Sequence, residues 1–223
     1  MAIPGAAEIA RYVGHHGWRR TTLRSSYVAA NKVVRLSLFG AMSLRPEQVA
    51  HNLLGQTDRY VCRLLEPREM RNASATLPDP TARSLTEAAD RNDLCCAVFD
   101  GDQIANLGLF SNVPTPLVGG LHVHFEAPCW YMHGGATLPA YRGQKLHARS
   151  VLRGALALFD RGVPKIVTLC ECTNYSSLVS AQRMGWESAG LLWSIGRGGR
   201  IAVGASREAR ALGMSLSVRS GPG

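Results

Sequence analysis

The stretch Thr137-Leu-Pro-Ala-Tyr-Arg-Gly-Gln-Lys-Leu-His-Ala148 is the most informative part of this sequence. An extended segment ends at Thr137, a glycine follows at Gly143, and a helical pattern begins directly after it. The start of a helix presents unpaired backbone N–H groups and the positive end of the helix dipole. Because glycine lets the main chain approach a ligand closely, the stretch predicts a site for an anion, and phosphate is the typical ligand.

A buried helix follows this turn. Apolar residues recur at three- and four-residue spacing between Lys145 and Arg161, which is the period of an amphipathic helix. Gly162 and Pro164 then provide the usual stop. The apolar positions are Ala148, Val151, Leu152, Ala155, Leu156 and Phe159.

The surrounding segments predict a sheet with short helices. Asp100-Gly101 accepts the backbone angles of a tight turn, so the flanking segments predict a hairpin of residues 94–99 and 103–110. Further strands are expected at 32–44, 122–125, 130–136, 165–172, 191–195 and 201–203. Helices are expected at 48–54, 59–70 and 174–184, and loops at 72–81 and 111–120.

The segment from Leu94 to Val203 resembles the GNAT acetyltransferase superfamily. The hallmark of that family is a strand, an Arg/Gln-x-x-Gly-x-Gly/Ala turn and a helix, which together hold the pyrophosphate of CoA. Arg142 falls on the first motif position, whereas Lys145 and His147 stand where the family has its small residues. The resemblance implies cofactor contacts from Thr137, Leu138, Arg142, Gly143, Gln144, Lys145, Leu146 and His147.

A second family signature lies downstream. The family has Asn-x-x-Ala, a short helix and Gly-Phe where the sheet opens for the pantetheine arm, and this chain has Asn174, Ser177 and then Gly185-Trp186. The resemblance implies that Asn174 and Ser177 contact the cofactor, although Asn174 can equally cap the following helix. Many family members carry a tyrosine acid seven positions after the Asn, and this chain has Ala181 there.

The resemblance implies an α/β (α+β) fold with a mixed, mostly antiparallel central sheet flanked by helices. We expect this GNAT-like domain to span residues 32–205. A basic N-terminal extension, 1–31, precedes it, and a flexible C-terminal tail, 206–223, follows.

Acyl transfer to an amine needs a base and donors for the developing oxyanion. Candidate bases are His133 on the strand before the turn and Glu171 on the neighbouring strand, with a cluster of His122, His124 and Glu126 as the alternative. A structural role for His133 stays open. Main-chain groups around residues 136–138 are the candidate oxyanion donors.

The function implied is an N-acyltransferase that uses acetyl-CoA or another acyl-CoA as co-substrate and acts on an amine acceptor that the sequence does not identify. One alternative takes its acyl group from an acyl carrier protein or acts on aminoacyl-tRNA. Another is a CoA-binding module without catalysis. A DNA-binding protein is disfavoured, since neither a helix-turn-helix pattern nor zinc-finger spacing is present.

The net charge of +9 resides at the two ends of the chain. Residues 1–35 carry six basic residues and one acidic residue, residues 190–223 carry five and one, and the middle is balanced at fourteen of each. Basic ends can attract the phosphates of CoA, a tRNA or an acidic carrier protein. They can equally serve solubility alone.

Composition indicates a globular protein of 223 residues with 46% hydrophobic residues. No apolar run is long enough to span a bilayer and no signal peptide is evident, so we expect a cytoplasmic protein without membrane contact. The six cysteines show no paired CxxC spacing, which predicts reduced thiols and no metal site. The sequence leaves the oligomeric state open.

Overall fold

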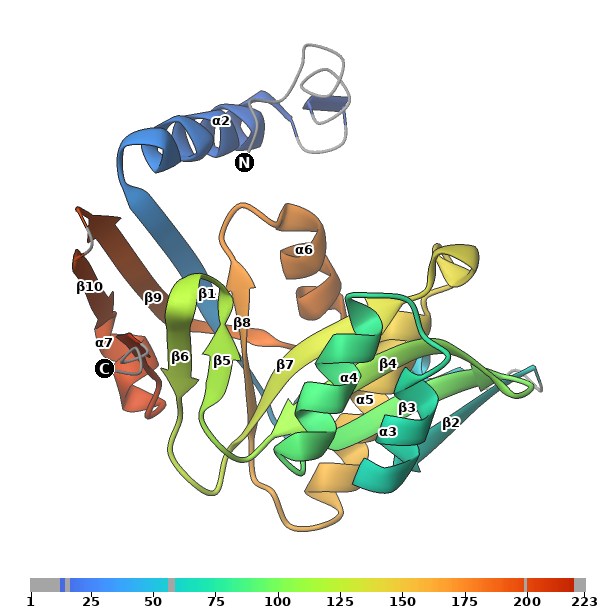
Figure 1. Cartoon of the computed structure of the whole chain (residues 1–223). Helices are drawn as coiled ribbons and strands as arrows, with labels where there is room; N and C mark the ends of the chain where they lie inside the picture. The colour runs from blue at the N-terminus through green and yellow to red at the C-terminus, as the bar shows by residue number, and fades with distance from the viewer. Residues whose placement is uncertain (1–12, 15–16, 56–58, 199, 219–223) are drawn as a thin grey trace.

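A computed structural model describes residues 13–14, 17–55, 59–198 and 200–218. Its centre is an eight-stranded sheet in the order β10-β9-β1-β8-β7-β4-β3-β2 (Figure 1). The strands are β1 (Arg35–Leu44), β2 (Tyr60–Leu65), β3 (Leu94–Asp100), β4 (Gln103–Ser111), β7 (Trp130–Thr137), β8 (Ile166–Glu171), β9 (Glu187–Arg197) and β10 (Arg200–Ala205).

Every neighbouring pair in this sheet is antiparallel except β7 and β8, which run parallel. The parallel pair requires a crossover connection, and the helix that follows the turn at 138–145 provides it. The predicted fold class, a mixed and mostly antiparallel sheet flanked by helices, is confirmed.

Helices cover both faces of the sheet. One face carries α5 (Leu146–Phe159) and α6 (Tyr175–Arg183). On the other face, α3 (Pro67–Ser74) and α4 (Thr81–Asp90) cover the half that contains β3 and β4. The remaining half is covered by α7 (Arg207–Ala211) and a three-stranded sheet of β11 (Ser215–Val218), β6 (Leu121–His124) and β5 (Thr115–Leu117).

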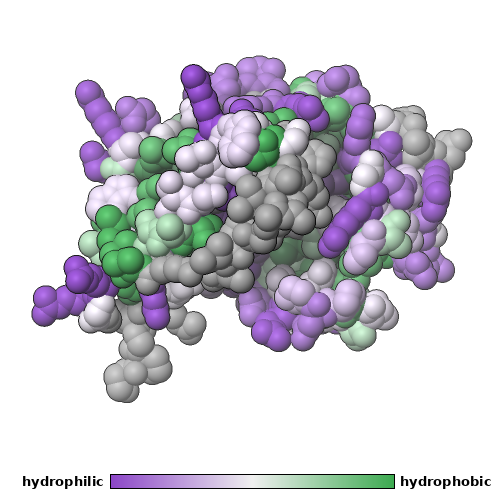
Figure 2. Space-filling model, turned by 90° about the horizontal axis from the view of Figure 1, so that it is seen from above, coloured by the Kyte–Doolittle hydropathy of each residue, from purple (hydrophilic) through white to green (hydrophobic). Residues whose placement is uncertain are grey.

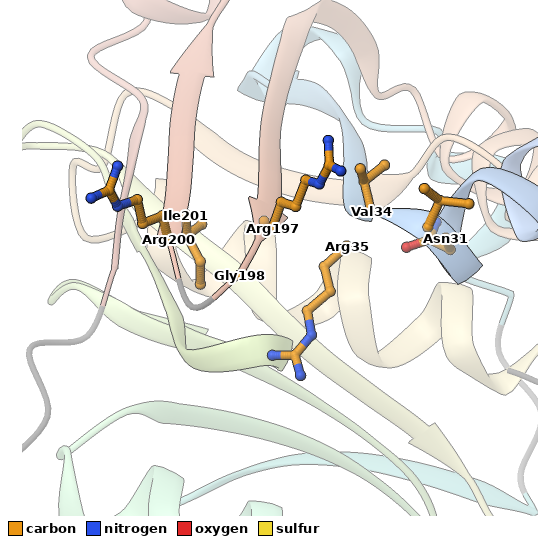
Figure 3. A pocket seen from close by; sticks show the side chains of 9 residues that line it. Asn31, Val34, Arg35, Arg197, Gly198, Arg200 and Ile201 are labelled. Carbon is orange, nitrogen blue, oxygen red and sulfur yellow. The ribbon is translucent and has the colours of Figure 1, made fainter.

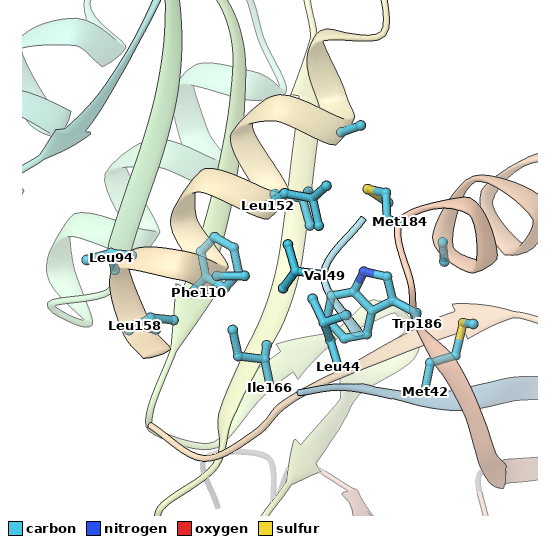
Figure 4. Close-up of a cluster of buried hydrophobic side chains, with 14 residues drawn as sticks. Met42, Leu44, Val49, Leu94, Phe110, Leu152, Leu158, Ile166, Met184 and Trp186 are labelled. Atoms are coloured by element: carbon cyan, nitrogen blue, oxygen red, sulfur yellow. The ribbon is translucent and has the colours of Figure 1, made fainter. Parts of the chain in front are cut away.

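The main core lies between α5 and the sheet (Figure 4). Phe110 from β4, Leu152 from α5 and Ile166 from β8 are fully buried there. Trp186 packs against them after α6 and is 3% exposed. This core fixes α5 against β4 and β7, so the start of α5 is held at a defined place beside the end of β7.

The structure corrects the predicted helix at 59–70. Residues Tyr60–Leu65 form β2, whose residues alternate between exposed and covered along its length and which pairs with β3. A helix begins only at Pro67, with a reciprocal cap between Glu66 and Glu69. Proline at a first helical position is a start signal, and it marks the boundary that the predicted helix overran. The predicted helix at 48–54 is likewise reduced to two short 3-10 turns, η1 (Pro46–Gln48) and η2 (His51–Leu53).

Part of the predicted flexible tail is folded. Residues 206–218 form α7 and β11, and β11 pairs with β6 through Leu216 and Val123. Both side chains are buried, and Ala209 of α7 is buried with them. Burial of these apolar residues explains why this segment is held against the domain. Residues 219–223 lie outside the described part.

The described part of the N-terminal extension is mainly a helix, α2 (Trp18–Val33), which runs past the predicted boundary at 31–32 and leads through Val34 into β1. Residues 1–12 of the extension lie outside the described part. Among the helices of the described residues, none combines the length and apolar character needed to traverse a bilayer.

Candidate functional site

The strands β7 and β8 separate midway along their length. They pair only at Trp130–Ile166, Tyr131–Val167 and Met132–Thr168. Beyond this point β7 continues beside β4 as far as Thr137, and β8 continues beside β1 as far as Glu171. The main-chain groups along the inner edges of the two strands therefore face a gap in the sheet.

A cavity of about 260 Å³ occupies this gap. Its walls come from β7, β8, α5 and α6, and its inner end is apolar, closed by Val151, Met184 and Trp186. Five of the candidate site residues predicted from the sequence line this one cavity: His133, His147, Glu171, Asn174 and Ser177. Residues up to 44 positions apart in the chain, His133 and Ser177, are thus brought together.

His133 is held by a buried carboxylate. Its Nε2 lies 2.9 Å from Asp93 Oδ2, and the side chain of Asp93 is fully buried. Since a carboxylate only accepts, Nε2 carries the proton and Nδ1 is the ring's remaining acceptor. His133 is also the extra residue of a β-bulge, because Met132 pairs with Phe110 and Gly134 with Leu109. A bulge re-aims the side chain it carries.

Arg91 completes this group. Its Nε and Nη2 lie 3.1 and 2.8 Å from the same Asp93 oxygen that binds His133. The second oxygen, Asp93 Oδ1, is buried and has no hydrogen-bond partner among the described residues. A buried carboxylate is costly unless paired, and Arg91 supplies the paired charge for Asp93 behind the imidazole.

Glu171 lies at the end of β8, beneath α2. Burial and then the negative charge of Glu171 raise the pKa of Tyr27, a residue of α2. The Tyr27 hydroxyl donates a hydrogen bond to Leu36 O at 2.8 Å. Glu171 therefore faces both the cavity and the helix above it.

His147 replaces a small motif residue and fills space beside β7. Its ring lies against Gly135, where an added Cβ would come 2.6 Å from the His147 Cε1 atom. Burial lowers the pKa of His147. The imidazole is thus held neutral in the cavity wall, and Gly135 is the residue that leaves room for it.

The turn before α5 has the form expected for an anion site. Gly143 has φ 82°, and Lys145 has φ 58°, a left-handed value that is uncommon for a residue with a side chain. Lys145 is the residue before the first turn of α5, no side chain caps this helix start, and the first turn contains no acidic residue. Arg142 and Lys145 are both exposed.

Asn106 ties this turn to the sheet. Its Nδ2 donates to Ala136 O at 2.9 Å and to Thr137 Oγ1 at 2.7 Å. Its Oδ1 is buried without a partner among the described residues. Leu138 N–H donates to Ala105 O at 3.0 Å, so it is not free to bind an oxyanion. The main-chain groups that face the cavity belong instead to residues 133–135, where β7 has left β8.

Three other residues that were proposed from the sequence have contacts within the protein. The Leu146 side chain is buried beside Val98 and Ala105, so only its main chain faces the turn. Gln144 is exposed and accepts a hydrogen bond from the Tyr60 hydroxyl. Asn174 Oδ1 accepts from Ser177 N–H at 3.2 Å and caps α6, which leaves its amide nitrogen for other partners.

The alternative base cluster does not reach the cavity. His124 lies in the small sheet, where its Nε2 is 2.7 Å from Ser217 Oγ. His122 is its neighbour on β6, and Glu126 borders a different cavity near α7. Of the candidate bases named from the sequence, only His133 and Glu171 line the gap between β7 and β8.

Comparisons with known proteins agree with this geometry at the level of fold. The sequence matches no family model, and no curated protein matches it. The structure resembles a GCN5-related N-acetyltransferase from Kribbella flavida with a TM-score of 0.51 and 12% identity, over 78% of this chain and 64% of that chain. A GCN5-related N-acetyltransferase from Sphaerobacter thermophilus gives 0.51 and 11%, over 83% and 56%. The chain has the GNAT fold.

A third structure with this fold, a tandem GNAT protein from the clavulanic acid biosynthesis pathway, has a TM-score of 0.51 and 9% identity, over 90% of this chain and 59% of that chain. This chain therefore spans less than two thirds of the length of each of the three proteins. At these identities the comparison concerns the arrangement of elements and not the chemistry.

Asp93, Arg91 and Asn106 were not among the candidate site residues expected from the sequence. Asp93 follows α4 in a turn that looks like any polar loop, and 40 residues separate it from His133. The position of Asn106 in the middle of an otherwise apolar strand could have indicated a structural role. A buried amide needs hydrogen-bond partners. No pattern within one segment links any of the three to the GNAT turn.

Lys145 provides a test of the turn. Replacing it with glycine should raise the free energy of unfolding by up to about 1 kcal/mol, because glycine adopts the left-handed conformation without steric cost. Replacing it with alanine keeps the strain, and both changes remove the ammonium group. Each variant should therefore bind CoA more weakly, and pantetheine, which lacks the phosphates, almost as before. Calorimetric titration measures this; an equal loss for the two ligands would indicate repacking of the turn instead of lost charge.

Proposed function

We propose that the chain is an N-acyltransferase that moves an acetyl or longer acyl group from a CoA thioester to an amine. The observation that supports this most is the single cavity between β7 and β8. It is lined by His147 in the first turn of α5, next to the anion-type turn, and by His133 of β7. A diphosphate, an extended arm and a reacting carbonyl can be bound along it in that order.

The turn would bind the diphosphate. The N–H groups at the start of α5 supply donors, and Arg142 and Lys145 supply positive charge. The pantetheine arm would then lie between α5 and α6, along Gly134 and Gly135, within reach of the Asn174 amide. Thr137, held by Asn106, keeps the end of β7 in place beside the phosphates.

The acyl transfer would proceed by direct attack. The amine nitrogen bonds to the thioester carbon while Nδ1 of His133 accepts its proton, and Asp93 stabilises the imidazolium that forms. Main-chain N–H groups of residues 133–135 would stabilise the oxyanion. The C–S bond then breaks and the electron pair leaves with sulfur. Ala181 lines the cavity where a family tyrosine would stand, so the thiolate would take its proton from water or from the acceptor's own ammonium group.

The names of the Kribbella flavida and Sphaerobacter thermophilus proteins favour acetyl as the transferred group. A longer acyl chain, an acyl carrier protein as donor and aminoacyl-tRNA as acceptor remain alternatives within the proposal. The cytoplasm remains the proposed location, and a CoA-binding module without turnover is the competing function.

The first test is binding of CoA. At a ligand concentration of 100 times Kd, CoA should stabilise the protein by about 2.7 kcal/mol. For a chain of this size that corresponds to a rise in Tm of about 5 to 10 °C. Arg142→Glu should abolish the rise, because a carboxylate at the turn repels the diphosphate.

The matched control is Arg161→Glu, an equal charge reversal on an exposed arginine just beyond the far end of α5. Arg161→Glu should show the same CoA-induced rise in Tm as the parent protein. If Arg142→Glu also shows this rise, the turn is excluded as the binding site. Mass spectrometry of the protein as purified would identify any CoA species that co-purifies with it, together with its acyl chain.

A further inference from the structure

The helix α2 lies next to the end of β8 and the start of α6, two elements that line the cavity. Figure 1 shows α2 above the sheet, at the end where β8 leads into α6. Two contacts fix it there. The Arg20 guanidinium lies 5.1 Å from the centre of the Tyr175 ring at the start of α6, and Tyr27 bonds to Leu36 of β1. The helix therefore spans from α6 to β1 across the end of β8.

The face of α2 that is turned toward the domain carries two arginines. Positions 20, 24 and 27 are separated by four and three residues, so they lie on one side of the helix. Arg20 contacts α6, Tyr27 is influenced by Glu171, and Arg24 lies between them and is half-buried. Arg20 and Arg24 thus lie near Asn174 and Glu171, outside the set of described residues that line the cavity.

The face of α2 that is turned toward the domain is positive. It carries Arg20 and Arg24, and the helix Trp18–Val33 contains no acidic residue. Figure 2 views the molecule from above and shows hydrophilic side chains interleaved with hydrophobic ones on this face. Inside the cavity Glu171 supplies a negative charge. Positive charge on α2 next to a carboxylate of the cavity suits a molecule that has an amine at one end and an anion at the other.

On the basis of the proposed function, we propose that the acceptor is a small amine that also carries a carboxylate or a phosphate. Arg20 and Arg24 bind the anionic group, and the amine reaches His133 inside the cavity. Guanidinium groups bind both anions through charge-assisted hydrogen bonds, so the two kinds of acceptor share one chemistry.

A second arginine group, near the C-terminal end of α2, does not fit this role. Arg35, Arg197 and Arg200 border another cavity, formed with the β9–β10 hairpin. Figure 3 shows their guanidinium groups pointing in three different directions. They do not converge on one anion, and none of them lines the cavity between β7 and β8.

The test uses acetyl-CoA and matched acceptors. ω-Amino acids of two to six carbons are each compared with the alkylamine of equal length that lacks the carboxylate, and glucosamine 6-phosphate is compared with glucosamine. For the best pair, kcat/KM should favour the anionic member at least about tenfold, the effect of one hydrogen bond to a charged group. The two series distinguish carboxylate from phosphate, and the preferred chain length gives the distance from amine to anion.

The double variant Arg20→Ala/Arg24→Ala should reduce this preference to less than about threefold while keeping Tm and the CoA shift, because one lost charge-assisted contact accounts for the tenfold ratio. Arg19→Ala is the control, since Arg19 shares its side of α2 with Leu23, which is 63% exposed. It should keep the preference.

Three outcomes overturn the inference and leave CoA binding untouched: equal rates for both members of every pair, an unchanged preference in the double variant, or turnover only with aminoacyl-tRNA or an acyl carrier protein. Absence of turnover with every acceptor in protein that still binds CoA also overturns it. Failure to bind CoA at all would instead refute the proposed function.

Discussion

Replacing His133 with alanine should lower kcat/KM about a hundredfold or more, the usual contribution of a general base. Asp93→Asn should lower it about ten- to a hundredfold, because the amide no longer selects the ring form that has its proton on Nε2. The decrease should be in kcat and not in KM for acetyl-CoA, since neither side chain is placed along the path of the cofactor. Release of thiol from acetyl-CoA, with an amine that supports turnover, measures it.

His124→Ala is the control for His133. It removes a histidine of similar bonding, to Ser217, that lies outside the cavity. It should leave kcat unchanged. Nitrogen NMR of the imidazole separates a catalytic from a merely structural role for Asp93: the Nε2–H form should dominate in the parent protein and be lost in Asp93→Asn. If the folded His133→Ala variant keeps full activity, His133 is not the general base and Glu171 is the remaining candidate.

Gly185→Ala should be the most destabilising single change at the site. Gly185 has φ 100°, and an added Cβ would lie 1.8 Å from the main-chain oxygen of Gln48. Backbone atoms cannot move aside as a side chain can, so we expect a loss of about 4 kcal/mol or more. For a chain of this size that is a fall in Tm of about 8 to 16 °C. Thermal unfolding measures it.

The matched control is Gly162→Ala at the end of α5. Gly162 has φ 85° and no atom within 4 Å of an added Cβ, so the change adds strain without a clash. It should cost about 1 to 2 kcal/mol. If the two variants unfold at the same temperature, the contact between Gly185 and Gln48 does not hold Trp186 against the cavity as the structure indicates.

The sequence was sufficient for the parts of the fold that follow local rules. The helix after Lys145, the Asp100-Gly101 hairpin and the glycine after α6 were recognisable because periodicity and turn chemistry act within a few residues. The resemblance of two motifs to the GNAT family implied His147, Asn174 and Ser177, and His133 and Glu171 were named as candidate bases on the neighbouring strands. All five line the one cavity.

The rest depends on contacts between distant segments. Tyr60–Leu65 forms a strand because it pairs with the free edge of β3. Its own alternation of exposed and covered residues is too short to exclude a helix from the sequence. Asp93 approaches His133 only after α4 and β7 have packed on the sheet. The position of α2 above Glu171 depends likewise on Tyr27 meeting β1, which no local pattern in the basic N-terminal segment indicates.

The pairing of β6 with β11 affects how the chain reaches its final state during synthesis. His124 and Ser217, which bond across this pair, are 93 residues apart. At about 5 to 20 residues per second, roughly 5 to 20 seconds pass between the emergence of the two strands. During that time the apolar side chains Leu121 and Val123 lack their final cover. This small sheet is therefore one part of the nascent chain where we expect chaperones to bind.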